Sequence, residues 1–137
     1  MNKNLDLILK LSLMQSNLVK KLDSSLSVHG ISFSEFIVMY QISLSPNNTV
    51  RRVDLAQSVG MSASGITRML NPMERLKLIE KEPNPRDARV SLVKLTDIGD
   101  ELLDDATKSV IYLLDEIFEA FKAKDIEMFL HLIKSIK

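Results

Sequence analysis

Apolar residues recur every three or four positions near the start of the chain, which predicts a long amphipathic helix over Leu5–Val28. Its apolar positions form one broad face and a second edge: Ile8, Leu11, Leu18, Leu22, Leu7, Met14, Leu5, Leu9 and Leu13. One partner helix covers a narrower stripe than this, so the helix is expected to pack within its own domain and against another chain. Gly30 is expected to end the helix, because glycine tolerates the left-handed conformation that closes many helices.

The next segment predicts a shorter helix with Ser32 or Ser34 as its N-cap. Its apolar side chains are expected to enter the core: Phe36, Ile37, Met39, Tyr40 and Ile42. The run Pro46-Asn47-Asn48 is a strong turn signal, so this helix is expected to stop before it.

The last third of the chain predicts one long helix and one short helix. Thr96 is suited to cap the long helix, whose apolar positions keep a helical repeat: Ile98, Leu102, Ala106, Val110, Leu113, Ile117 and Phe121. A break is expected at Ala123–Asp125, before a final helix with apolar Ile126, Phe129, Leu130, Ile133 and Ile136. Terminal helices this rich in Leu, Ile and Phe leave too much apolar surface for a monomer, so we predict a two-fold homodimer built from both ends of the chain.

Between these helices the stretch DLAQSVGMSASGITRML has the pattern of a helix-turn-helix. Ala56 supplies the small residue where the helices cross, Gly60 the turn residue that tolerates positive φ, and Ile66 the apolar residue that faces the first helix. Ser62 is well placed to cap the second helix. Further apolar positions on this side are Leu55, Val59, Leu70 and Met73.

The opposite face of the second helix is short, polar and basic, with Ser64, Thr67, Arg68 and Asn71. Arginine and asparagine can each bond two atoms of a base edge, and serine and threonine can serve bases or phosphates. Gly65 would let a phosphate approach the backbone closely. Taken alone, such a face is more often simply solvated, so its interpretation depends on the neighbouring segment of the chain.

That neighbouring segment predicts a charged hairpin. Its expected strands are Glu80–Glu82 and Val90–Leu95, and residues 83–89 form the turn between them. Asp87 precedes Arg89 by two residues, close enough for its carboxylate to orient the guanidinium. An extended arginine suits the narrow, negative minor groove of A·T-rich DNA, and Arg86 is expected to contact a flanking phosphate. A surface ion pair is often incidental, but beside a helix-turn-helix it favours a role in DNA binding.

The amino-acid composition excludes several other classes of protein. The chain has 137 residues, about one domain, and it contains no cysteine, which excludes disulfides and thiol-based redox sensing. With only His29 and His131 as imidazole donors, neither a metal site nor a cofactor is predicted. No apolar run reaches the roughly 20 residues of a membrane span and the N-terminus lacks the pattern of a signal peptide, so we expect a cytoplasmic protein without a membrane partner.

The net charge of zero hides an uneven distribution along the sequence. Residues 1–50 carry +1, residues 51–96 carry +4 and residues 97–137 carry −5. The basic middle would attract phosphate, whereas the acidic C-terminal part would be repelled by it and is expected to point elsewhere.

Combined in this order, these motifs resemble the MarR family of winged-helix transcription regulators over nearly the full length of the chain. The resemblance rests on VDLAQSVGMSASGITRML, on PRDAR with its Asp-x-Arg element, and on VKLTDIGDELL. It implies a dimer with interlocked terminal helices, the second helix of the motif in the major groove and the wing arginine in the minor groove. By motif position, the residues expected to face the major groove or form the wing contact are Ser62, Ser64, Thr67, Arg68, Asn71, Asp87 and Arg89.

Two residues depart from the family's pattern. Pro72 lies within the second helix of the motif, where it removes a backbone donor and clashes with the carbonyl of Arg68, so a bend is expected and Arg75 becomes a weaker candidate contact. Lys77 stands where the family commonly has glycine, which implies either a strained residue or a differently ended helix.

The sequence therefore predicts a single domain, 1–137, that is mainly α with a small β-hairpin. Residues 1–30 and 97–137 are expected to form dimerisation helices around a winged helix-turn-helix DNA-binding lobe at residues 31–96. The predicted function is sequence-specific binding of a palindromic double-stranded operator, and the resemblance implies that the protein acts as a repressor. Many members of the family release DNA when a small, often aromatic, acid binds, and the residues that could line such a crevice are Met14, Phe33, Phe36, Tyr40 and Tyr112.

Two other classes of function remain open. A winged-helix protein-interaction module that has lost DNA binding would fit the neutral net charge and the acidic C-terminal part. An enzyme is disfavoured, because the acidic residues of the long helix, such as Asp104 and Asp115, lie among solvated charges with no histidine or phosphate-binding loop near them in sequence.

Overall fold

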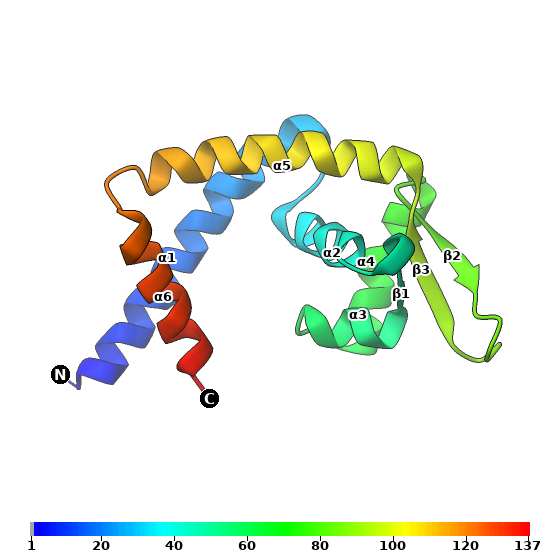
Figure 1. Ribbon diagram of the computed structural model, residues 1–137, viewed down its shortest axis with the longest axis horizontal. Helices are drawn as coiled ribbons and strands as arrows, with labels where there is room; N and C mark the ends of the chain where they lie inside the picture. The colour runs from blue at the N-terminus through cyan, green and yellow to red at the C-terminus, as the bar shows by residue number, and fades with distance from the viewer. Residues whose placement is uncertain (1) are drawn as a thin grey trace.

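The computed structural model describes residues 2–137, in which helices form an arch over a small sheet (Figure 1). The helices are α1 Lys3–Leu26, α2 Phe33–Ser43, α3 Arg52–Ser58, α4 Ala63–Arg75, α5 Asp97–Ile117 and α6 Ala123–Ser135. The strands are β1 Thr49–Arg51, β2 Ile79–Pro83 and β3 Ser91–Leu95, and short 3-10 turns cover Ser27–His29 and Pro46–Asn48. Among the residues described, no helix has the length and apolar character that crossing a membrane requires.

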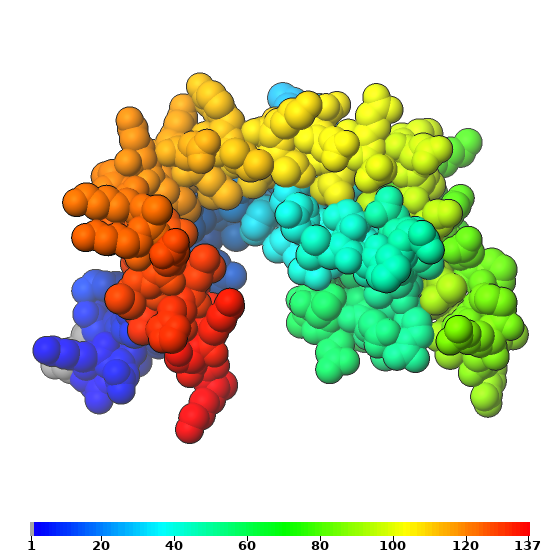
Figure 2. Space-filling model, viewed as in Figure 1, coloured from blue at the N-terminus to red at the C-terminus, as the bar shows by residue number. Residues whose placement is uncertain are grey.

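The long helix α5 spans the top of the arch and joins two unequal legs (Figure 1). One leg holds α1 and α6, and the other is a lobe made of α2, α3, α4 and the sheet. Figure 2 shows an open gap between the two legs below α5. The mainly helical winged fold expected from the sequence is therefore confirmed.

The sheet has three antiparallel strands in the order β1-β3-β2. The β2–β3 hairpin was expected, and it pairs Ile79 with Leu95 and Pro83 with Ser91. Strand β1 was not expected, because three residues are too few to show an alternating pattern. It pairs Arg51 with Leu92 and so attaches the start of α3 to the wing.

One hydrophobic core fills the lobe and the underside of α5. Of the two caps that the sequence offered, Ser32 is the one that caps α2, and it forms a capping box with Glu35. Gly30 has the expected left-handed φ of 74°. The core prediction for Tyr40 was wrong: Tyr40 is exposed and Val38 is buried, because α2 turns that face towards α5 and the sheet. On α5, Leu103, Ala106 and Val110 are buried, whereas Ile98 is exposed.

The boundary between the last two helices was also wrong. Helix α5 ends at Ile117, and Ala123–Asp125, expected as the break, instead forms the first turn of α6. The Asp125 carboxylate accepts a hydrogen bond of 2.9 Å from the backbone N–H of Lys122, which satisfies a free donor at the start of α6. An acidic side chain also interacts favourably with the positive end of the helix, so Asp125 begins the helix and does not break it.

Helix α4 continues through Pro72 to Arg75 and closes on Lys77. The bend expected at Pro72 stays a prediction. Lys77 has a left-handed φ of 61°, and the backbone N–H groups of Lys77 and Leu78 donate to the carbonyls of Glu74 and Met73 at 2.9 and 3.0 Å. This pair of hydrogen bonds is the Schellman motif, in which glycine usually occupies the left-handed position. The sequence implied either a strained residue at Lys77 or a differently ended helix, and the structure has the strained residue.

Replacing Lys77 by glycine is expected to stabilise the fold by about 0.5–1 kcal/mol, because glycine adopts the left-handed conformation without a Cβ clash. Urea unfolding followed by circular dichroism measures the change. Lys77→Ala removes the charge and keeps the Cβ, so it serves as the control. Equal stabilisation by both variants would show that the side chain, and not the backbone conformation, is responsible.

Candidate nucleic-acid interface

Helices α3 and α4 form the helix-turn-helix that the sequence predicted. The turn contains Gly60 with φ of 68°, and Ala56 and Ile66 are buried where the two helices pack. The Ser62 hydroxyl accepts a 3.0 Å hydrogen bond from the backbone N–H of Gly65, which confirms Ser62 as the N-cap of α4. Leu70 and Met73 complete the buried face, so the opposite face of α4 is left to solvent.

That outward face carries the predicted polar residues. Ser64, Arg68 and Asn71 are exposed, and Thr67 lies partly buried beside them. At Gly65 an added Cβ would meet the Ser62 hydroxyl oxygen at 3.1 Å and the Met61 side chain at 3.4 Å. Glycine at this position therefore leaves room for the cap, in addition to any close approach of a phosphate.

The tip of the wing holds Arg89 away from the body of the lobe. The Asp87 carboxylate accepts hydrogen bonds from the Arg89 backbone N–H at 3.0 Å and from its Nε at 3.2 Å. These bonds, the backbone one first, hold the pKa of Asp87 below its usual value, so the carboxylate stays charged. The Arg89 side chain is nevertheless 91% exposed, and the predicted orientation of the arginine by Asp87 is seen.

Arg86 is also exposed at the wing tip. Its backbone N–H donates a 3.0 Å hydrogen bond to the Asn84 side-chain oxygen, which forms a local turn. The tip thus carries two cationic side chains in a segment stabilised by short-range hydrogen bonds from Asn84 and Asp87.

Two arginines at the start of α3 were missed by the sequence analysis. Arg51 makes a two-bond ion pair with Asp54, with Nε–Oδ2 and Nη2–Oδ1 distances of 2.7 and 2.9 Å. The hydrogen bonds to Arg51 hold the pKa of Asp54 below its usual value. Arg52 Nη1 donates a 2.9 Å hydrogen bond to Thr67 Oγ1 on α4. Two adjacent basic residues at the start of a helix-turn-helix are the sequence feature that could have marked them as candidates.

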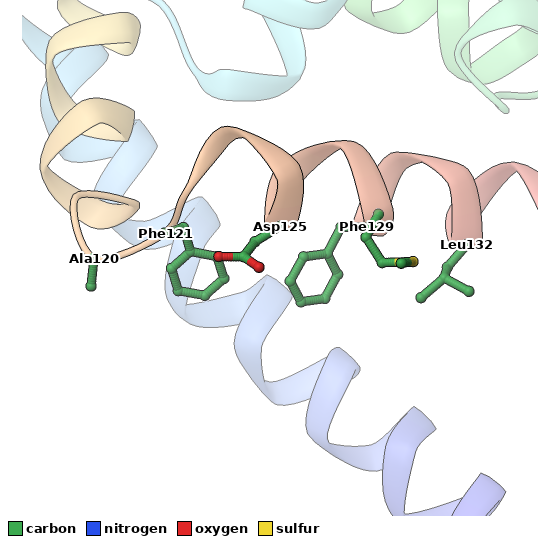
Figure 3. A pocket seen from close by; sticks show the side chains of 6 residues that line it. Ala120, Phe121, Asp125, Phe129 and Leu132 are labelled. Atoms are coloured by element: carbon green, nitrogen blue, oxygen red, sulfur yellow. The ribbon is translucent and has the colours of Figure 1, made fainter.

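A second exposed surface is apolar and lies on the other leg. A shallow groove along α6 is lined by Ala120, Phe121, Asp125, Met128, Phe129 and Leu132. Figure 3 shows Phe121, Asp125, Phe129 and Leu132 projecting to the same side, from α6 and the turn before it. Helix α6 has no buried residue, and the N-terminal half of α1 likewise leaves its leucines exposed.

The structure brings together only some of the five residues that the sequence analysis suggested for an effector crevice. Phe33, Phe36 and Tyr40 form a row along α2, with ring centroids 6.1 and 5.8 Å apart. Phe36 belongs to the core, whereas Met14 and Tyr112 are exposed on α1 and α5. Within residues 2–137, no group of three or more histidine, aspartate or glutamate side chains is arranged to hold a metal ion.

The fold and the site define a winged helix-turn-helix protein with a polar helix face and an exposed wing arginine. A MarR family model matches residues 29–90. The regulator MhqR of Bacillus subtilis is 21% identical over 98% of this chain and 91% of its own length. The repressor MprA of Escherichia coli is 23% identical over 82% of this chain and 64% of its own length. A mutant MarR of Escherichia coli, solved in complex with operator DNA, superimposes with a TM-score of 0.87 at 25% identity, covering 97% of this chain and 94% of the other. The chain is thus similar to the MarR family in sequence over residues 29–90, and to a MarR structure in fold over nearly its whole length.

Proposed function

We propose that this protein is a dimeric transcription repressor that binds a palindromic site in double-stranded DNA. The observation that carries the proposal is the geometry of the lobe, in which α4 exposes a polar face and Arg89, bonded to Asp87, is 91% exposed at the wing tip. The similarity to MprA, named as a repressor, and to MarR, solved with operator DNA, supports the same function.

In this proposal α4 enters the major groove. Arg68 and Asn71 have the donor and acceptor groups to read guanine and adenine edges, and Ser64 and Thr67 contact bases or phosphates beside them. Ser62 chiefly caps the helix, and the free backbone N–H groups at this end of α4 favour a nearby phosphate. Gly65 leaves the backbone open on that side.

The wing would lie along the adjacent minor groove. Arg89 is placed in the groove, where an A·T-rich sequence is narrow and negative, and Arg86 contacts the flanking phosphates. Asp87 takes no part in contacting the DNA directly and acts by orienting Arg89.

Two copies are proposed to join through α1, α5 and α6, whose exposed apolar side chains have no cover in a single chain. The dimer would present two lobes to successive turns of the duplex, which accounts for a palindromic site. We further propose a protein without enzymatic activity or cofactor, which acts in the cytoplasm and whose DNA affinity is lowered by a small-molecule effector.

Arg89→Ala and Arg68→Ala test the proposed function. Each variant is expected to bind a duplex selected by the wild-type protein about 10- to 100-fold more weakly, because each removes a charged contact to DNA. Fluorescence anisotropy across a salt series measures the affinity, and the slope of log K against log salt is expected to be steep, at about 0.9 for each phosphate neutralised.

Lys108→Ala, at an exposed position of α5, is the control and is expected to bind as the wild type does. Wild-type affinity in both arginine variants would contradict the proposal. If the wild-type protein retained no DNA at low salt but retained a protein partner, the interaction-module alternative would replace it.

A further inference from the structure

Arg52 lies where the sheet of the wing meets the helix-turn-helix. Strand β1 ends at Arg51, which is held against Leu92 of β3, and Arg52 is the first residue of α3. The backbone position of Arg52 is therefore set by the sheet that also carries the wing. From that position its side chain reaches α4 and donates to Thr67.

The environment of Arg52 is unusual for a surface arginine. Among the ion pairs of residues 2–137, Arg51 pairs with Asp54 and Arg89 with Asp87, whereas Arg52 has no carboxylate partner. Its Nε is the one buried side-chain nitrogen or oxygen of the described residues that makes no hydrogen bond. An unsatisfied buried donor lowers stability, so stability of the fold alone does not account for this arrangement.

The bond from Arg52 determines what the Thr67 hydroxyl can do. A threonine hydroxyl has one proton to donate and two lone pairs to accept, and Arg52 occupies one lone pair. The Thr107 hydroxyl of α5 donates a 2.7 Å hydrogen bond to the carbonyl of Leu103, as threonine in a helix often does. No such bond from Thr67 exists within residues 2–137, so its proton is free for an acceptor outside the chain.

We propose that Arg52 is a positioning residue of the DNA interface, which holds Thr67 so that its hydroxyl donates to an acceptor on a base edge. Guanine N7 and O6 and thymine O4 are such acceptors in the major groove. Arg52 thereby contributes to sequence discrimination through Thr67, and not chiefly through its own charge. This inference rests on the proposed function.

A double-mutant cycle with Arg52→Met and Thr67→Val tests the inference. Both substitutions keep side-chain bulk and remove hydrogen-bonding groups. Affinity is measured for a duplex selected by the wild-type protein from a random library, and for a scrambled duplex of the same composition. We expect Arg52→Met to weaken binding to the selected duplex about fivefold when Thr67 is present and by less than about twofold in the Thr67→Val background.

Binding to the scrambled duplex and the salt slope are expected to change little. Arg51→Met is the matched control, because the neighbouring arginine at the end of β1 pairs with Asp54 of α3, and it is expected to show no coupling to Thr67. Arg52→Lys keeps the charge without the planar guanidinium and is expected to recover less than half of the lost discrimination. It also replaces Arg52→Met should that variant fail to fold by circular dichroism.

Additive effects of the two substitutions, equal weakening on both duplexes, or a salt slope lower by about 0.9 would overturn the inference, because each indicates that Arg52 acts as a simple phosphate contact. Failure of the wild-type protein to select any duplex would instead overturn the proposed function itself.

Discussion

Replacing Phe129 by aspartate is expected to convert the proposed dimer to a monomer and to weaken binding to a palindromic duplex about 100-fold or more. Phe129 lies in the apolar groove of α6, where its ring stacks on that of Phe121 with centroids 6.0 Å apart. A charge at the centre of an apolar interface loses its hydration without gaining a partner. A single lobe then binds one half of the site and loses the advantage of two linked contacts.

Analytical ultracentrifugation measures the oligomeric state, and anisotropy measures the affinity. His131→Asp introduces the same charge two residues further along α6, outside the residues that line the groove, and is expected to leave both the dimer and the affinity largely unchanged. A monomeric wild-type protein, or a Phe129→Asp variant that stays dimeric, would show that α6 does not form the interface.

Replacing Gly99 by alanine is expected to destabilise the fold by about 3 kcal/mol, which lowers the melting temperature by roughly 10 °C. Gly99 lies in the first turn of α5, and a Cβ there would collide with the backbone carbonyl of Leu78. That carbonyl also accepts a 3.1 Å hydrogen bond from the backbone N–H of Thr96, so it cannot move away without breaking the junction.

Thermal unfolding of the purified protein measures the loss. Ile98→Ala, at the neighbouring exposed position of the same turn, is the control and is expected to change stability by less than about 0.5 kcal/mol. Comparable stability of Gly99→Ala and wild type would mean that α5 can shift relative to β2 without cost.

Local signals made much of this fold predictable from the sequence. Ser32, Ser62 and Thr96 each have a hydroxyl that caps the next helix in the chain, and glycines at 30 and 60 have the left-handed φ that their positions required. The wing was predictable from a charged turn followed by the alternating segment Val90–Leu95, which indicates a strand that folds back on the residues before the turn. Each of these features depends on residues close together in the chain.

Features set by contacts between distant segments were not predictable in the same way. Strand β1 exists because β3 pairs with it, and the requirement for glycine at 99 comes from Leu78. Periodicity identified α2 and α5 as amphipathic but placed Tyr40 of α2 in the core, since it does not fix which edge of a helix meets its neighbours. The bond between Arg52 and Thr67 joins residues on different helices and left no local pattern.

The junction around Leu78 ties down the base of the wing more firmly than its tip, and these are the parts of the lobe proposed to contact DNA together with α4. Backbone and side-chain bonds from Thr96 fix the base of the hairpin, directly behind the end of α4. Beyond β2 and β3, the hydrogen bonds made by Asn84 and Asp87 stay within the tip itself. We therefore expect bending to concentrate at the tip, so that in the proposed complex Arg89 adapts to grooves of different width while the register of α4 on the bases stays constant.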